Sequence, residues 1–290
     1  MARVELLLKT SVVPSRKVLL KAMSFAKAIQ GSIHILGKDY HRSEDHTFLD
    51  FLSSADGQRK RLSDNYLQWT GQVLDKVEQI AKEEGIEYNL DFHRLEGRQW
   101  MKQLLGALVD GANLLLIDQN NIRVTTDLLA TLANADRNVL ILSDKSWTHA
   151  GTMLAAIDPL HREDKAGKVD ESVIELGELV GRALNMDVKL VYCRYIAGYL
   201  SEYKDQILAS QKEGVMDFVA DRRLQRLPLI FARGNPEAAL PEVVKAHKAA
   251  MLVMGACRRG SMSRFLMGST VDALLKNPPC DLLLVTSPQL

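Results

Sequence analysis

The chain has few of the residues that mark extracellular or membrane proteins. Its 290 residues include three cysteines, Cys193, Cys257 and Cys280, which are widely spaced and form no Cys-x-x-Cys pair. A disulfide framework or a structural zinc site is therefore not expected. No window holds 18 consecutive apolar residues, and the first residues lack the pattern of a secretion signal. We expect a cytoplasmic protein without membrane-inserted segments.

An excess of charge of one sign is also missing. The chain has 37 basic and 36 acidic residues, which gives a formal net charge of +1. A nearly neutral protein lacks the positive field that attracts nucleic acids or anionic lipid surfaces. Neither nucleic acid nor membrane is expected as a partner.

Catalytic motifs are absent too. The seven histidines are scattered, without a His-Glu-x-x-His motif or a pair four residues apart, so we expect most of them at the surface. No Gly-x-Ser-x-Gly motif is present, and no nucleophile has a neighbouring base. The sequence predicts neither catalytic nor metal-binding residues. Weak ATP hydrolysis, or an active site assembled from distant residues, stays open.

What the chain does contain is a regular alternation of apolar runs and helical patterns. Apolar residues make up 47% of the sequence, enough for two domains with their own cores. Parallel strands need helical crossovers, so this alternation predicts an α/β fold with a parallel sheet covered on both faces. The expected strands are residues 4–8, 32–36, 86–95, 114–117, 139–142, 154–157, 188–193, 229–231, 251–254 and 282–285. The expected helices include residues 18–29, 67–81, 100–108, 173–184 and 203–226.

The order of elements occurs twice. Gly97 aligns with Gly234 and Asp118 with Gly255, in both cases 137 residues further on, whereas Val139 aligns with Leu282 at a distance of 143 residues. The first copy is therefore six residues shorter before its last strand. We predict one domain over residues 1–142, a polar linker over 143–151 and a second domain over 152–290.

A glycine-containing loop follows the strand at residues 251–254. Gly255, Gly260 and Gly268 precede a helical pattern that begins with Ser269 and Thr270. Glycines permit positive φ and a close approach of a ligand, and the free N–H groups of a helix start favour an anion. It is not a Walker loop, because Ser261 and Met262 stand where Lys and Ser or Thr are required.

The loop resembles the nucleotide loop of the universal stress protein family, Gly-x2-Gly-x9-Gly-Ser/Thr. Gly255 matches the first glycine and Gly268-Ser269 the last pair, Arg258 replaces the middle glycine, and Gly260 stands where many relatives carry a glycine. The whole chain looks like a tandem member of the family, similar to the bacterial E-type. That resemblance implies two five-stranded, parallel, open Rossmann-like sheets of the adenine nucleotide alpha hydrolase type, with helices on both faces.

The resemblance also implies a nucleotide site in the second domain, for ATP or another adenine nucleotide with Mg²⁺ on its phosphates. Asp158 matches the acidic position near adenine and ribose, and Cys193 matches the position whose backbone meets the base. Met254 and Gly255 match residues beneath the ribose. Gly268, Ser269 and Thr270 match the helix start that contacts phosphate. In the first domain, Lys9 and Asp118 occupy two of these positions, so we expect no nucleotide there.

Several of these residues have a second interpretation. Ser269 with Asp272 could cap a helix, and Asp158 before Pro159 could start a turn. Arg258 could contact phosphate or occupy its space, and Cys257 could be a redox-sensitive thiol or a small loop residue. At the level of function, the alternatives are a nucleotide-independent protein-interaction module and a cleft for another phosphate-bearing or amphipathic metabolite.

The last strands of the two domains carry a further expectation. Residues 139–142 and 282–285 are both apolar runs, and an exposed apolar edge strand must be covered. In the family such strands pair edge to edge. We therefore expect an internal pseudo-dimer of the two domains, with further homodimerisation and protein partners left open.

Overall fold

The structure is a computed structural model that describes residues 3–39, 55–108, 114–147, 151–160, 168–196, 198–256 and 268–286. The chain forms two compact units, residues 1–123 and 124–290. The strands are β1 (Arg3–Lys9), β2 (Ser32–Lys38), β3 (Leu90–Leu95), β4 (Leu114–Asp118), β5 (Asn138–Leu142), β6 (Thr152–Ala156), β7 (Asp187–Arg194), β8 (Leu229–Arg233), β9 (Ala249–Gly255) and β10 (Asp281–Val285). The helices are α1 (Arg16–Ala28), α2 (Ala55–Glu84), α3 (Trp100–Ala107), α4 (Thr126–Asn134), α5 (Lys168–Ala183), α6 (Lys204–Asp221), α7 (Pro236–His247) and α8 (Ser269–Lys276), with short 3₁₀ helices η3 (Gly97–Gln99) and η4 (Gly198–Tyr203).

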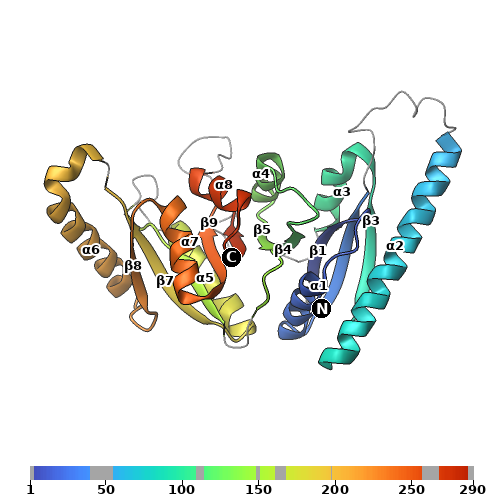
Figure 1. Ribbon diagram of the computed structural model, residues 1–290, viewed down its shortest axis with the longest axis horizontal. Coiled ribbons are helices and arrows are strands. Elements are labelled where there is room, and N and C mark those ends of the chain that lie inside the picture. Colours follow the sequence, from blue (N-terminus) through green and yellow to red (C-terminus); the bar gives the residue numbers. More distant parts are fainter. Residues whose placement is uncertain are drawn as a thin grey trace. The chain divides into compact units, whose positions relative to one another are not determined.

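The first unit is built on four parallel strands in the order β3-β2-β1-β4 (Figure 1). The five central residues of β1 and of β2 are all buried, as expected for strands covered on both faces. Helix α1 begins where the Ser15 side chain accepts a hydrogen bond from the Val18 N–H. Trp69 of α2 then packs edge-on against Phe92 of β3. The alternating sequence pattern therefore produces the predicted α/β sheet.

The second unit contains a five-stranded parallel sheet in the order β8-β7-β6-β9-β10, which confirms the predicted fold class for this copy (Figure 1). Right-handed crossovers place α5 and α6 on one face and α7 and α8 on the other. Strand β5 joins the free edge of β10 and runs antiparallel to it. The fold is thus α/β with a mostly parallel sheet.

The landmarks of the sequence repeat have equivalent structural roles. Gly97 and Gly234 both have positive φ, at 65° and 105°, and lie within two residues of the end of the third strand of their copy. Asp118 and Gly255 are the last residues of β4 and β9. The two copies therefore repeat backbone conformation as well as element order.

The pairing of β5 with β10 is symmetric. Leu140 lies opposite Leu283, and the hydrogen bonds at the two ends of the seam come from equivalent positions. At one end, Asp281 Oδ1 accepts from the Ser143 N–H at 2.8 Å and from the Ser143 hydroxyl at 2.6 Å. At the other end, Asn138 Oδ1 accepts from the Thr286 N–H at 3.0 Å. The two apolar runs singled out in the sequence therefore cover one another.

This pairing explains why the compact units do not divide at the boundary of the sequence repeat. The repeat places residues 139–142 in the first domain, whereas the second unit begins at residue 124 and includes α4 and β5. Strand β5 makes its antiparallel ladder with β10, and Ser143 and Trp147 both donate to Asp281. The predicted linker at residues 143–151 thus begins with residues that belong to the packed seam.

Several predicted boundaries are wrong. Helix α2 begins at Ala55 rather than near residue 67, and α5 begins at Lys168 rather than at residue 173. The third strand was expected over residues 86–95, but β3 begins at Leu90 because its neighbour β2 offers its first ladder partner, Ile33, at that point. Helix α6 ends at Asp221 rather than near Arg226. Among the helices of the described residues, none is long and apolar enough to cross a membrane.

The buried carboxylate of Asp281 generates a prediction about stability. Asp281→Ala leaves two Ser143 donors and the Trp147 indole N–H without their acceptor, because Trp147 Nε1 donates to Asp281 Oδ2 at 2.7 Å. We expect a loss of about 2–4 kcal/mol in the free energy of unfolding. Urea unfolding followed by tryptophan fluorescence measures it, and the exposed Asp217→Ala is the control. Equal stability of both variants would contradict a structural role for this carboxylate.

Candidate functional site

A cavity of about 660 Å³ opens at the carboxyl ends of β6, β7 and β9. Strand β6 is the branching point of the sheet, because the chain continues from it to β7 on one side while β9 lies on its other side. The connections that follow β6 and β9 lead to opposite sides of the sheet, so a crevice forms between them at the carboxyl ends of these two strands. The walls come from the start of α5, from α6 and α7, and from the first turn of α8.

Five residues predicted from the sequence line this cavity: Asp158, Cys193, Met254, Gly255 and Thr270. They come from four separate elements or their ends, and the fold brings them together.

The remaining predicted residues fall into two groups. Gly268 and Ser269 directly precede Thr270, are exposed, and do not belong to the lining. Arg258 and Gly260, together with Cys257, lie outside the described residues.

Asp158 lies just beyond β6, with an exposed side chain, and a turn follows at Pro159 and Leu160. Its backbone N–H donates to Oδ1 of Asp170 at 2.8 Å. Asp170 is 5% exposed, stands in the first turn of α5 and also lines the cavity. The cleft therefore contains a second carboxylate that our sequence reasoning missed. The sequence did contain a sign of Asp170, because it is an acidic residue at the start of a helical pattern, where carboxylates are favoured.

The thiol and phenol beside Asp158 are held in their neutral forms. Burial, with a smaller contribution from the nearby Asp158 carboxylate, raises the pKa of the Cys193 thiol to about 11. Burial also raises the pKa of Tyr192 to about 12, helped by Asp158 and Cys193. At neutral pH both groups keep their protons, so Cys193 is not a nucleophile.

The charge of the cavity is negative in its described part. Asp158 and Asp170 are the only charged side chains among the lining residues that the structure describes, and no lysine or arginine is among them. Most of the lining is apolar, including Ile157, Val191 and Leu240. Such a surface accepts hydrogen bonds from N–H and O–H groups and repels anions.

Gly255 has a packing reason to be glycine. A Cβ atom at this position would lie 2.6 Å from Cγ1 of Val169, at the start of α5. Its φ is not in the positive range, so the backbone conformation does not itself require a glycine at this position. Helix α5 can approach the end of β9 because Gly255 has no side chain.

The predicted capping pair at the start of α8 does not form. Gly268 is the N-cap residue, with φ −64°, and Ser269 is already the first residue of the helix. Asp272 instead pairs with Lys276 one turn later, at 2.6 Å. The first turn of α8 therefore has no side-chain cap, and Thr270 contributes to the cavity lining.

In the first unit, side chains fill the corresponding end of the sheet. A Cβ at Gly37 would lie 3.1–3.2 Å from atoms of Thr10, Tyr66 and Trp69. Asp39 accepts from the Thr10 hydroxyl at 3.0 Å and from Arg94 Nε at 2.7 Å. Side chains are therefore closely packed at this end of the first sheet.

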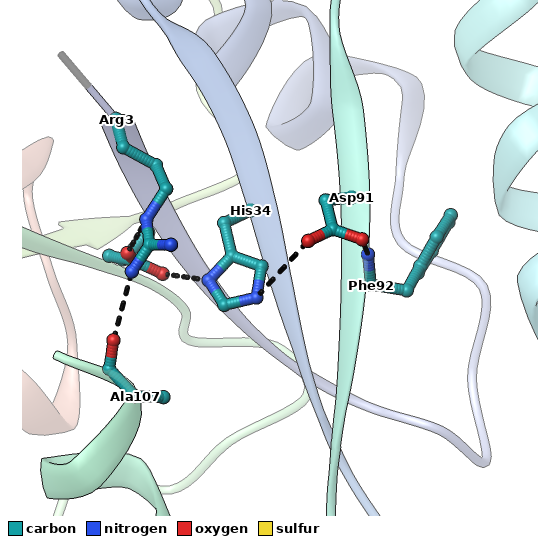
Figure 2. Close-up of polar contacts among 6 residues, drawn as sticks. Arg3, His34, Asp91, Phe92 and Ala107 are labelled. Atoms are coloured by element: carbon teal, nitrogen blue, oxygen red, sulfur yellow. Dashed lines mark hydrogen bonds and ion pairs between the residues drawn. The ribbon is translucent and has the colours of Figure 1, made fainter. Parts of the chain in front are cut away.

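A buried ionic cluster lies at the opposite end of the first sheet, at the amino ends of its strands. Arg3 and His34, which lie beside one another in Figure 2, both contact the carboxylate of Glu5, which is completely buried. His34 Nδ1 lies 2.6 Å from Glu5 Oε2, and Arg3 also donates to the carbonyl of Ala107 at 2.9 Å. His34 is 5% exposed, so the expectation of a surface histidine is wrong for it.

Asp91 lies on the outer side of that histidine, with 4.0 Å between its Oδ2 and His34 Nε2. Its side chain is mostly exposed. In the described part of the chain, no three His, Cys, Asp or Glu side chains are arranged to hold a metal ion. We interpret the cluster as compensation for the buried charge of Glu5, which needs cationic or hydrogen-bonded partners.

The raised pKa of Cys193 predicts an unusual pH dependence. The thiolate is the reactive form, so alkylation of Cys193 in the folded chain should still accelerate between pH 9 and about 11. In the urea-unfolded chain it should level off near the ordinary value of 9.0. Asp158→Asn removes a neighbouring negative charge and should lower the pKa, whereas the distant Asp217→Asn should not. Rates come from mass spectrometry of the Cys193 peptide after iodoacetamide treatment, and a plateau at pH 9 in the folded protein contradicts this prediction.

The two glycines of the loop motif should respond differently to substitution. Gly255→Ala brings a Cβ to 2.6 Å from Val169 and should lower the free energy of unfolding by about 1–3 kcal/mol. At Gly268 no described atom would lie within 4 Å of a Cβ, so Gly268→Ala should cost about 1 kcal/mol or less. Chemical denaturation of both variants measures the difference. A reversed order of stabilities is the result that excludes this packing explanation.

Comparison with known proteins agrees with this fold. Residues 190–286 match the model of the universal stress protein family. The universal stress protein E homolog of Haemophilus influenzae is 22% identical over 160 residues, or 50% of each protein, so the chain spans about half the length of the curated relative it matches.

Solved structures cover almost the whole chain. A functionally unknown protein from Pseudomonas aeruginosa PAO1 has a TM-score of 0.64 and 17% identity, over 98% of this chain and 92% of that one. A universal stress protein from Archaeoglobus fulgidus has a TM-score of 0.59 and 14% identity, over 97% and 98%. At these identities the likeness concerns the fold. The chain is thus similar to universal stress proteins, in sequence over residues 190–286 and in fold over almost its whole length.

Proposed function

We propose that the second domain binds ATP or another adenine nucleotide in the cavity at the ends of β6, β7 and β9. The observation that carries this proposal is the gathering of Asp158, Cys193, Met254, Gly255 and Thr270 around one cavity of about 660 Å³. Its volume is in the range of small-molecule sites, about 300–1,000 Å³. Its place at the branching point of an open parallel sheet is where such folds bind ligands.

The charges of the cleft orient the nucleotide. The nucleoside occupies the apolar and acidic part, where Asp158 accepts hydrogen bonds from ribose hydroxyls or base N–H groups. The phosphates lie away from the two carboxylates, toward the start of α8, whose first N–H groups carry partial positive charge. Arg258, beside this region in the sequence, is assigned to the phosphates.

Mg²⁺ fits this arrangement as a companion of the nucleotide. Magnesium in nucleotide sites is held mainly by phosphate oxygens and water, with one or two protein oxygens. The hydroxyl of Thr270 belongs to a lining residue in the first turn of α8 and is the protein oxygen that we assign to this role. Mg²⁺ would neutralise part of the phosphate charge there.

The role of binding is regulatory rather than catalytic. Cys193 is protonated at neutral pH because its pKa is about 11, and no general base is paired with a hydroxyl among the described lining residues. The protein would act in the stress response by changing its contacts with partners when nucleotide binds, in keeping with the universal stress proteins that it resembles. Action in the cytoplasm is part of the same proposal.

The first domain acts as the partner of the second in an internal pseudo-dimer. The symmetric ladder between β5 and β10 supports this, because Ser143 and Thr286 make equivalent bonds at its two ends. Each of these strands already has a partner on the side where it would pair with another chain. A homodimer would therefore have to use a different surface.

The test is a titration of the full chain with ATP and Mg²⁺ by isothermal calorimetry. We expect one site per chain in the unaltered protein, and at least a tenfold loss of affinity in Gly268→Val, because its side chain projects at the start of α8 where phosphate would sit. No described atom would lie within 4 Å of a Cβ at Gly268, so the variant should fold.

Gly106→Val is the matched control, since Gly106 of α3 also has open space and lies in the first unit. Equal affinity of the two variants would show that the start of α8 does not contact the nucleotide. Absence of heat with the unaltered protein, together with no nucleotide in native mass spectra, would favour a nucleotide-independent interaction module. A different bound mass would identify another phosphate-bearing or amphipathic ligand.

A further inference from the structure

The buried carboxylate of Asp170 lies where the first turn of α5 meets the chain that leaves β6. The N–H of Ile157 still donates to a neighbouring strand, at 3.0 Å from the carbonyl oxygen of Val191 in β7. The next N–H, that of Asp158, donates instead to Asp170 Oδ1 at 2.8 Å. A backbone N–H at the end of a sheet needs a new acceptor, and here a side chain 12 residues further along the chain supplies it. This carboxylate therefore ties the turn at Asp158 to α5.

The start of α5 is itself closely packed. Val169, the residue before Asp170, has its Cγ1 only 2.6 Å from the point where a Cβ of Gly255 would lie, so the first turn rests on the end of β9. Asp170 is 5% exposed. Neighbouring residues at one helix turn thus contact the ends of two strands, through Val169 on β9 and through Asp170 just beyond β6. A side chain held in this way is a firm support for a binding group.

The group that it supports is the carboxylate of Asp158. This side chain is exposed and belongs to the lining of the cavity, whereas its own backbone is fixed from behind. An aspartate side chain has few staggered positions once its backbone is fixed. The bond to Asp170 therefore restricts where the Asp158 carboxylate can lie, and a hydrogen bond to a charged acceptor is stronger than one to a neutral acceptor.

We propose that Asp170 is a positioning residue of the nucleotide site, which holds the turn after β6 so that Asp158 meets the ribose or base in one orientation. This inference rests on the proposed nucleotide site. Asp170 acts through Asp158, because its Oδ1 already accepts the Asp158 N–H. Without this bond, nucleotide binding must also order the turn, which costs affinity. The accepting oxygen carries the effect, so asparagine can replace Asp170.

The experiment measures the affinity of the full chain for ATP with Mg²⁺ by calorimetry. Asp170→Ala removes the acceptor and should weaken binding about tenfold. Asp170→Leu removes it at a larger side-chain volume and should weaken binding to the same degree, so a failure of one variant to fold leaves the other as the test. Asp170→Asn keeps an oxygen at the same reach and should stay within about twofold of the unaltered chain. Glu175→Ala, which removes an exposed carboxylate from the same helix, is the control and should bind like the unaltered chain.

A double-mutant cycle with Asp158→Ala separates positioning from a general structural role. Asp158→Ala keeps the backbone N–H that bonds to Asp170 but has no carboxylate to be positioned. In this background Asp170→Ala should weaken ATP binding by less than about twofold more. A general loosening of the domain would weaken binding equally in both backgrounds.

Three results overturn the inference and leave nucleotide binding standing. They are unchanged or tighter binding by Asp170→Ala, an Asp170→Asn variant as weak as Asp170→Ala, and an equal loss in both backgrounds of the cycle. Failure of the unaltered chain to bind ATP overturns the inference and the proposed function together.

Discussion

The cleft depends on one topological constraint, the change of direction at β6. The chain proceeds from β6 through β7 to β8 on one side, and returns to place β9 and β10 on the other. Because all five strands are parallel, their carboxyl ends meet at one edge, and the crossovers leave that edge on opposite faces. Residues as distant as Asp158 and Thr270 then line one cavity.

Topology alone does not create a binding site, as the first unit shows. Its strands have the same order, with β1 in the position of β6 and β4 in that of β9. There Trp69 of α2 is 3% exposed and packs with Tyr66 and Thr10 around Gly37. The same backbone therefore offers a cavity in one copy and packed side chains in the other, and the side chains near the strand ends decide the outcome.

The sequence predicted the elements of this fold well because buried parallel strands are continuous apolar runs, as in Met251–Met254, and because surface helices show a clear apolar stripe. The glycine-loop motif, aligned with the family, also predicted five of the residues that line the cleft. What the sequence missed depends on three-dimensional contacts. No local pattern shows that Asp170 holds the backbone of Asp158 or that Glu5 needs His34. The sequence also did not show where strand β3 begins, because its first residue, Leu90, is set by pairing with Ile33 near the start of β2.

The glycines of the motif show how far a motif can carry a functional argument. Gly255 matches the family pattern, yet Val169 alone is enough to require glycine there, because a Cβ would lie only 2.6 Å from its side chain. A protein that had lost its ligand would keep this glycine for packing alone. Gly268 is different, because no described atom would lie within 4 Å of a Cβ at that position. Packing within the described residues does not require a glycine at Gly268. The motif therefore supports a ligand more strongly through Gly268 than through Gly255.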